Sequence, residues 1–424
     1  MQNRRSFLIK SSAALLGLFT PIISEAQNGF PFKMVEDLSN ESWSNIRKLF
    51  PLNTERSFLN NGTMGPSPYH VVQAVHDAID HINTSAVYGG GKAKAKLALS
   101  QLLNIKPSEL ALTHNVTEGI NIAAWGIPLK KGEEVIVTDH EHVGNGLPWL
   151  HRARFSNAKV RVLRLQDTAE KTLEELKKLI NSKTRIIAVP HVTCTTGQVL
   201  PVKQICELAK KKNIWSAIDG AHGVGMMPLD LKDLGCDVYS SCCHKWLLGP
   251  KGTGVLFVSE ECQEKLKAVF VGGYSGLDWN VHREAPFISD THTTAAHKYH
   301  YGTQDASRYY GINSAVEFHN SVGPKRVYNR ILELQKYLQM KLGELNAPIE
   351  VLTPSEQVSR CGITTFRFKE ITNKHLRTEL NKAKIIVRYI AESELDALRI
   401  STHIYNQKSE IDRLIVELNR IVKS

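Results

Sequence analysis

Short apolar runs alternate with amphipathic stretches along most of the chain. Between residues 109 and 258 the runs are rich in valine, isoleucine and leucine, and stretches with helical periodicity separate them. Apolar runs bounded by helices are typical of parallel strands that are covered on both faces. The pattern predicts strands at 109–113, 135–138, 160–165, 185–192, 214–219, 238–243 and 254–258. It predicts helices at 115–127, 172–180 and 202–212, and a further helical stretch that runs through Trp149.

The pattern changes near residue 322. A long amphipathic stretch at 325–345 is followed by strand-like and helix-like stretches in alternation, which is typical of an α+β domain. We therefore predict a large α/β domain at 66–321, with a mostly parallel sheet covered by helices, and a smaller α+β domain at 322–424. Residues 27–65 are expected to complete the small domain and the entrance to its site.

The amino terminus has the pattern of an export signal. Arg4 and Arg5 precede an apolar run that ends at a small-residue site near Ala26. Paired arginines in this position are typical of twin-arginine signals, which use the export machinery for folded proteins. We predict that residues 1–26 form this signal and that the body is periplasmic, with an uncleaved, membrane-tethered form as the alternative. The apolar run is short for a bilayer, so no stable membrane insertion of the mature chain is expected.

Charge and cysteine content narrow the partners. The 424 residues carry a formal charge of +11, and without residues 1–26 they hold 50 basic and 41 acidic side chains, or about +9. The lysines are spread out along the chain, so no nucleic-acid partner is expected. Seven scattered cysteines without CxxC spacing predict neither a disulfide framework nor a cysteine zinc site. Histidine pairs in DHEH (139–142) and HKYH (297–300) have ordinary structural explanations, and no metal is expected.

Polar side chains with useful chemistry follow several of the predicted strands. Thr117 lies between a strand and a helix, where the first N–H groups favour an anion. His142, Asp219 and Lys245 each follow another strand. Each alone has a simpler explanation, such as a helix cap for Thr117 or a turn former for Asp219. In an open α/β sheet, however, ligands bind at the carboxyl ends of the strands, so these side chains are expected to meet.

Together these residue types meet the needs of pyridoxal 5′-phosphate (PLP). This cofactor needs a lysine amine for covalent attachment, a carboxylate beside its pyridine nitrogen, an anion site for its phosphate and a flat partner for its ring. Lys245, Asp219, Thr117 and His142 supply these in turn, and His222 can hydrogen-bond near the phenolic oxygen. The lysine in the glycine-rich turn 240–254 is therefore interpreted as the covalent attachment point.

Eight phrases spread over nearly all of the mature chain carry a family resemblance. The phrases DGAH and HKWxxGPxGxG are specific as a set. The chain resembles the class V aminotransferase-like enzymes of PLP fold type I, and within them the isopenicillin N epimerase-like branch. The phrases are FLNNGTMGP (58–66), NVTEGIN (115–121), EHVGN (141–145), HVTCTTGQVLPV (191–202), AIDGAHGVGMMPLDL (217–231), CCHKWLLGPKGTGVLF (242–257), YGTQD (301–305) and LRISTHIYN (398–406).

The resemblance implies further roles. Arg399 would bind the α-carboxylate of the substrate, a task that suits a guanidinium, and the alternative is an ordinary salt bridge. Asn61 would line the substrate entrance. Thr303 would reach the phosphate of the neighbouring subunit's cofactor, which implies a homodimer with shared active sites. The other implied cofactor contacts are Val116, Cys242 and His244.

Two cysteines depart from the family pattern. Cys242 stands where relatives often carry serine or asparagine, and its thiol is a weaker phosphate donor. Cys194 stands where cysteine desulfurases have an asparagine near the cofactor.

The sequence leaves the reaction open. Cysteine desulfurases need a catalytic cysteine on the loop before the carboxylate-binding arginine, and 387–399 contains none. An aminotransferase or an epimerase acting at the Cα of an amino acid or aminoacyl group remains. An epimerase needs a second acid–base group opposite Lys245, from His142, Tyr88, Tyr274 or water. A C–S lyase working by β-elimination and a catalytically inactive exported scaffold are the alternatives.

Nucleotide chemistry is disfavoured. GAHGVG (220–225) has its glycines in the wrong order for a dinucleotide fingerprint, and GPKGTG (249–254) lacks the ending of a P-loop. The substrate, a small molecule of amino-acid type, is expected to be selected by the loops 84–92 and 272–300. The segment 272–305 is predicted to be a long functional loop or a subunit contact.

Overall fold

The structure is a computed structural model that describes residues 37–275, 278–282, 284–285, 287–289 and 295–423. The export signal predicted for residues 1–26 lies outside these ranges and stays a prediction. Part of the loop 272–300, which is expected to select the substrate, also lies outside them. Within the described ranges, no helix combines the length and the apolar character needed to cross a lipid bilayer.

A seven-stranded sheet forms the centre of the large domain. Its strand order is β2-β8-β7-β6-β5-β3-β4, and all pairs from β7 to β4 are parallel. Strand β8 runs antiparallel to β7 and β2, because a turn rather than a helix connects it to β7. The mostly parallel sheet is therefore confirmed. The strands are β2 (Leu110–Thr113), β3 (Glu134–Thr138), β4 (Lys159–Leu163), β5 (Thr184–Pro190), β6 (Trp215–Asp219), β7 (Val238–Cys242) and β8 (Gly254–Val258).

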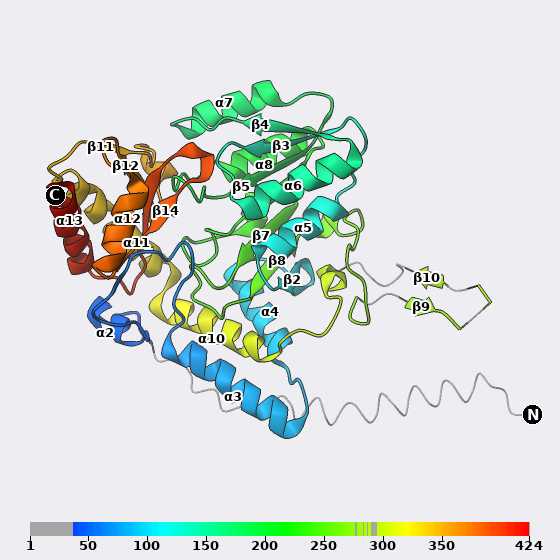
Figure 1. The fold of residues 1–424 in the computed structure, drawn as a ribbon. Coiled ribbons are helices and arrows are strands. Elements are labelled where there is room, and N and C mark those ends of the chain that lie inside the picture. Colours follow the sequence, from blue (N-terminus) through cyan, green and yellow to red (C-terminus); the bar gives the residue numbers. More distant parts are fainter. Residues whose placement is uncertain (1–36, 276–277, 283, 286, 290–294, 424) are drawn as a thin grey trace, which may run out of the picture.

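Helices cover both faces of this sheet (Figure 1). One face packs against α5 (Val116–Gly126) and α6 (Val143–Ser156), through buried side chains such as Ile120 and Trp149. The other face packs against residues from several helices, and each fully buried large apolar side chain contributes about 1.5–3 kcal/mol. These helices are α3 (Tyr69–Ser85), α4 (Gly91–Leu102), α7 (Ala169–Leu179), α8 (Val202–Lys211), α9 (Leu231–Leu234) and α10 (Ser307–Val322).

The small domain is a four-stranded antiparallel sheet of order β11-β12-β15-β14 with helices packed on it. Leu398 and Ile400 of β15 share a core with Leu376 and Leu380 of α12. The elements are α11 (Pro324–Leu342), β11 (Ile349–Val351), β12 (Ile363–Phe368), α12 (Asn373–Lys382), β13 (Ile385–Ile386), β14 (Arg388–Ile390), β15 (Ala397–Ser401) and α13 (Lys408–Lys423).

The amino-terminal segment crosses to the small domain. After α2 (Trp43–Lys48), strand β1 (Ser57–Phe58) pairs in parallel with β13, and Asn60 bridges to Ser401. This pairing places residues 57–63 beside the end of β15. Between 272 and 300, β9 (Asp278–Asn280) and β10 (Phe287–Ser289) form a hairpin that projects from the body (Figure 1).

Element boundaries differ from the sequence prediction where capping decides them. The helix predicted at 172–180 begins at Ala169, because the Thr168 side chain accepts a hydrogen bond from the Lys171 N–H at 3.3 Å. The Asn115 side chain caps α5 in the same way by accepting from the Glu118 N–H at 2.9 Å. Side-chain caps of this kind satisfy backbone donors that an unfinished helix turn leaves free.

Buried histidines make the fold acid-sensitive. Burial lowers the pKa of His191 and His319 to about 4, that of His300 and His403 to about 3, and that of His222 well below its usual value. Below pH 6.5 the unfolded chain therefore binds protons that the folded chain does not, and stability falls as the pH falls.

We expect the free energy of unfolding to drop by about 1 kcal/mol per buried histidine between pH 7 and 5.5. Urea unfolding at the two values of pH measures this change. A free energy of unfolding that stays constant or rises on acidification would contradict the expectation.

Candidate functional site

Strands β6 and β7 bring the candidate catalytic residues to one edge of the large sheet. Asp219 is the last residue of β6 and pairs in register with Ser240 of β7. Lys245 lies in the turn that follows β7. Because both strands are parallel and end at the same edge, the sequence prediction that these side chains meet follows from the topology.

The turn that carries Lys245 is fixed from three sides. The Cys243 N–H donates to the Thr253 carbonyl at 3.0 Å, and the Gly65 N–H donates to the His244 carbonyl at 2.9 Å. The ring of His403 donates through Nε2 to the Trp246 carbonyl at 2.9 Å, because its Nδ1 accepts from the Ile404 N–H.

A glycine is required where the amino-terminal segment crosses this turn. A Cβ on Gly65 would lie 2.0 Å from the Lys245 carbonyl oxygen. The backbone of the turn is therefore held in place, whereas the half-buried Lys245 side chain makes no hydrogen bond or ion pair with any residue that the structure describes. Its amine is free to react.

Asp219 is a buried carboxyl group. Its Oδ1 accepts from the Ala221 N–H at 2.9 Å, and within the described chain no cation forms an ion pair with it. Burial raises the pKa of Asp219, and the charge of Lys245 opposes this rise. A protonated pyridine nitrogen placed beside it would hold the carboxyl group ionised.

His222 has a defined tautomer. Its Nδ1 accepts a hydrogen bond from Trp246 Nε1 at 3.0 Å, so the neutral ring carries its proton on Nε2. Burial, followed by the charge of Lys245, holds its pKa well below the usual value. His222 is therefore a neutral donor through Nε2, as its predicted role at the phenolic oxygen requires.

Two helices begin next to each other at the site. Val116 and Thr117 are the first residues of α5, where backbone N–H groups lack intrahelical acceptors and favour an anion. A Cβ on Gly119 would lie 2.1 Å from Ser240 Oγ, so a glycine is needed for α5 to lie against β7. A Cβ on Gly144 would meet Thr117 Oγ1 at 2.6 Å and His142 Nδ1 at 3.0 Å, which places Thr117 and His142 side by side.

His142 is the N-cap residue of α6. Its Nδ1 accepts from the Gly144 N–H at 3.0 Å. Burial and then the charge of Lys245 lower its pKa to about 4. The ring is therefore neutral at ordinary pH and suits the role of a flat partner better than that of a base.

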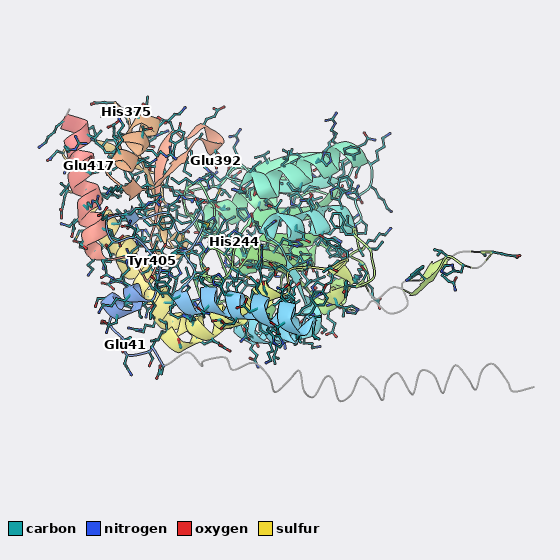
Figure 2. The ribbon with its side chains drawn as sticks, turned by 60° about the horizontal axis from the view of Figure 1, so that its bottom comes forward. Glu41, His244, His375, Glu392, Tyr405 and Glu417 are labelled. Atoms are coloured by element: carbon teal, nitrogen blue, oxygen red, sulfur yellow. The ribbon has the colours of Figure 1, made fainter. Side chains whose placement is uncertain are left out.

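Cys242 and His244 make structural contacts around the turn. The buried Cys242 thiol donates to the Ala221 carbonyl at 3.6 Å, and burial raises its pKa to about 11. His244 Nδ1 donates to the Thr253 carbonyl at 3.3 Å. In the side-chain view, His244 lies within the body of the molecule rather than at its periphery (Figure 2).

Thr303 lies in a different part of the chain. It lines a cavity of about 130 Å³ together with Tyr88, Lys92 and Tyr274, and no residue around Lys245 lines that cavity. Tyr88 and Tyr274 thus lie together at this cavity, and their role as a second acid–base group opposite Lys245 stays a prediction. The dimer implied by Thr303 stays a prediction.

Arg399, on β15, is fully buried without a carboxylate partner. Its Nη1 donates to the Cys194 carbonyl at 2.8 Å and its Nη2 to Thr63 Oγ1 at 3.0 Å. Its Nε has no hydrogen-bond partner, and it forms no ion pair with any residue that the structure describes. Burial lowers its pKa to about 10. A buried, unpaired guanidinium is costly unless an anion binds to it, so the ordinary salt bridge considered from the sequence is not found.

Asn61 is buried, and its place at the substrate entrance stays a prediction. Its side chain is fully buried, Oδ1 accepts from the Tyr405 hydroxyl at 3.0 Å, and Nδ2 has no partner. The neighbours Asn60 and Thr63 contact Arg399 instead. In an extended segment, successive side chains point to opposite sides. Asn60 and Asn61 are adjacent in the chain and therefore face opposite sides.

Sequence reasoning also missed two charged residues near the site. Arg388 lies opposite Arg399 on the neighbouring strand and forms an ion pair with Glu392. Glu141, next to His142, is half-buried, and its removal from water raises its pKa to about 7. Glu141 lies inside the phrase EHVGN, and Arg388 lies in the segment 387–399, but only the strand register and the burial reveal their positions.

The residues present fit PLP. The site offers a free lysine amine, a buried carboxyl group without a cation, a neutral histidine donor and a helix start for a phosphate. No cluster of three or more His, Cys, Asp or Glu side chains within the described ranges is arranged to hold a metal ion.

Comparisons with known proteins agree with this fit. The family model for class-V aminotransferases matches residues 67–414. An isopenicillin N epimerase from Amycolatopsis lactamdurans is 28% identical over 90% of this chain and 99% of its own. A probable cysteine desulfurase from Halalkalibacterium halodurans is 28% identical over 88% and 97%.

A solved structure has the same fold. A variant of C-DES with glycine covalently linked to its PLP cofactor superposes with a TM-score of 0.80, 23% identity and coverage of 88% of this chain and 98% of that one. The predicted PLP fold type I and its cofactor are confirmed. The chain belongs to the class-V aminotransferase family, and its cofactor is PLP.

Proposed function

We propose that the protein is a PLP-dependent epimerase or aminotransferase that moves the Cα proton of an α-amino acid or aminoacyl substrate. The observation that carries this proposal is the combination of a free lysine amine at Lys245 with a buried, unpaired guanidinium at Arg399. The first can hold and transfer a proton, and the second requires an anion such as an α-carboxylate.

One set of site residues would hold the cofactor, and another would bind the substrate and move its proton. When bound, PLP supplies an electron-accepting ring conjugated to the substrate amine. Asp219 would hold the ring nitrogen protonated, and His222 would donate through Nε2 to the phenolic oxygen. The N–H groups at the start of α5 would bind the phosphate, and the ring of His142 would be the flat partner of the cofactor ring.

Lys245 and Arg399 act on the substrate itself. The guanidinium orients the α-carboxylate, so that the Cα–H bond points toward the Lys245 amine. The amine then takes the proton from Cα as a general base and returns it as the acid. An epimer forms when a second donor delivers a proton to the opposite face of Cα. Transamination results when the proton is instead delivered to an atom other than Cα.

Persulfide chemistry is disfavoured by the state of the thiols. All seven cysteines of the chain are buried, and burial raises the pKa of Cys194, the thiol beside Arg399, to about 11. A desulfurase needs an accessible thiolate to accept sulfur. This supports the interpretation made from the cysteine-free loop 387–399.

A C–S lyase is the second candidate. The 28% identity to a probable cysteine desulfurase favours it over an inactive scaffold, because cleavage of a C–S bond by elimination needs only Cα deprotonation and no thiol of the protein. The same Lys245 amine would start this reaction.

The test is exchange of the Cα proton with solvent. We expect the PLP-loaded mature chain, incubated in D₂O with L- and D-amino acids and aminoacyl compounds, to place deuterium at Cα of at least one of them. Chiral chromatography identifies an epimerase, and a keto acid formed without release of ammonia identifies an aminotransferase. Pyruvate and ammonia, together with sulfide from cysteine or cysteine persulfide from cystine, identify the lyase. If no compound with a free α-carboxylate gains deuterium, the proposal is wrong.

A further inference from the structure

A second cavity lies next to the carboxylate site, at the edge of the small sheet. Its volume is about 420 Å³, which is within the range of small-molecule sites. It is formed where edge strand β14, the start of α12 and the loop after β1 meet. Its lining residues are Asn60, Thr63, Lys374, Arg377, Val387, Arg388 and Tyr389.

This cavity shares its wall with Arg399. Asn60 Oδ1 and Thr63 Oγ1 both accept hydrogen bonds from Arg399 Nη2, at 3.4 and 3.0 Å. A Cβ on Gly62, between them, would lie 3.2 Å from the same Nη2. Asn60 and Thr63 therefore contact both the cavity and the guanidinium that we assign to the α-carboxylate.

The cavity is strongly cationic. Arg388 is paired with Glu392, whereas Lys374 and Arg377 form neither ion pairs nor side-chain hydrogen bonds within the described part of the chain. The other acidic group nearby, Asp396, accepts from Asn373 at 3.4 Å. Two unpaired cations therefore remain, and the positive end of the α12 dipole adds to them.

The fold directs these cations to the cavity. Asn373 fixes the start of α12 through bonds to the backbone of Phe368, at 3.1 and 3.0 Å. Leu376 and Leu380 are fully buried under the helix. Lys374 and Arg377 are three positions apart and so are neighbours on the remaining, exposed surface. Figure 2 places Glu392, at the same edge, on the side of the small domain that faces the large sheet.

We propose that the substrate carries a second anionic group, a carboxylate or a phosphate, and that Lys374 and Arg377 bind it in this cavity. The inference rests on the proposed function, because Arg399 takes the α-carboxylate. It names the substrate class as an α-amino acid or aminoacyl compound with an anionic distal end. A solvated helix surface would explain the two charges alone, but not their place on a cavity that adjoins Arg399.

The test uses ligands without an amine, so that no turnover occurs. Calorimetry on the PLP-loaded mature chain compares dicarboxylates of four to seven carbons, the matching ω-phosphono acids, and the ω-amides of the same lengths. We expect the diacid or the phosphono acid of one length to bind about tenfold more tightly than its amide. Whichever of the two binds more tightly identifies the distal group.

Matched variants on one helix locate the effect. The double variant Lys374→Ala/Arg377→Ala should lose the preference for the second anionic group while its melting temperature stays that of the parent. Lys382→Ala, on the same helix but paired with Glu379 at 2.8 Å, should keep it. Equal binding of acids and amides, no binding at any length, or a preference that survives in the double variant would each overturn the inference.

A failure of the proposed function looks different. If the protein binds the diacids through Lys374 and Arg377 but never exchanges a Cα proton, the proposed reaction is wrong and the anion site is supported. If it exchanges the proton but does not distinguish acids from amides, the proposed reaction is supported and the anion site is wrong.

Discussion

Replacing Lys245 with alanine will abolish turnover and the covalent attachment of PLP. General acid–base catalysis by a positioned group is worth about 10²- to 10⁴-fold, and the variant also loses covalent catalysis by the amine, so we expect at least a 10⁴-fold loss of kcat. Borohydride reduction followed by peptide mass analysis should locate the cofactor on Lys245 in the parent and on no residue of the variant.

Two further variants separate chemistry from charge. Lys245→Arg keeps the positive charge but lacks a nucleophilic amine, and we expect it to be as inactive as the alanine variant. Lys251→Ala removes the nearby lysine of the same turn, whose Nζ bonds to Ser67 Oγ at 2.9 Å, and should still bind PLP covalently. Substantial turnover by either Lys245 variant would show that another group moves the proton.

The large domain could be predicted well from the sequence, because its strands and helices are encoded by local patterns of apolar and polar residues. Strands such as β5 and β6 are apolar on both faces, and the helices between them have clear periodicity, so their order along the chain determines a parallel sheet. The residues at the strand ends, Asp219 and Lys245, follow from that order. Their meeting needs no side-chain detail, since parallel neighbours end at one edge.

The rest of the site depends on register and burial, which a single sequence does not contain. Asn60 rather than Asn61 contacts Arg399, and this choice depends on how β1 pairs with β13 more than 300 residues away. The pairing of Arg388 opposite Arg399 is set by the register of β14 on β15. The position of Tyr88 and Tyr274 in the cavity with Thr303 depends on how two long loops pack.

Replacing Arg399 with methionine will weaken the binding of α-carboxylates while leaving the fold stable. Removing one side of a buried, hydrogen-bonded charge pair costs about 2–5 kcal/mol, which is about a 30- to 4,000-fold loss of affinity. In the free chain, however, the guanidinium is buried without a carboxylate and its Nε has no partner. An apolar side chain of similar length removes this desolvation cost, so the melting temperature should stay within a few degrees of the parent or rise.

Arg330→Met is the matched control, because Arg330 is also buried and its Nε also lacks a partner, but its guanidinium has a carboxylate partner within the chain. It donates to Glu333 at 2.9 Å and to the Asn406 carbonyl at 3.1 Å, and its guanidinium lies 5.3 Å from the ring centre of Trp43. This variant should lose stability and keep carboxylate affinity, which is the reverse of Arg399→Met. Calorimetric binding and thermal unfolding of both variants measure the contrast. If Arg399→Met unfolds as readily as Arg330→Met and still binds carboxylates, then Arg399 is a structural arginine and the substrate is held elsewhere.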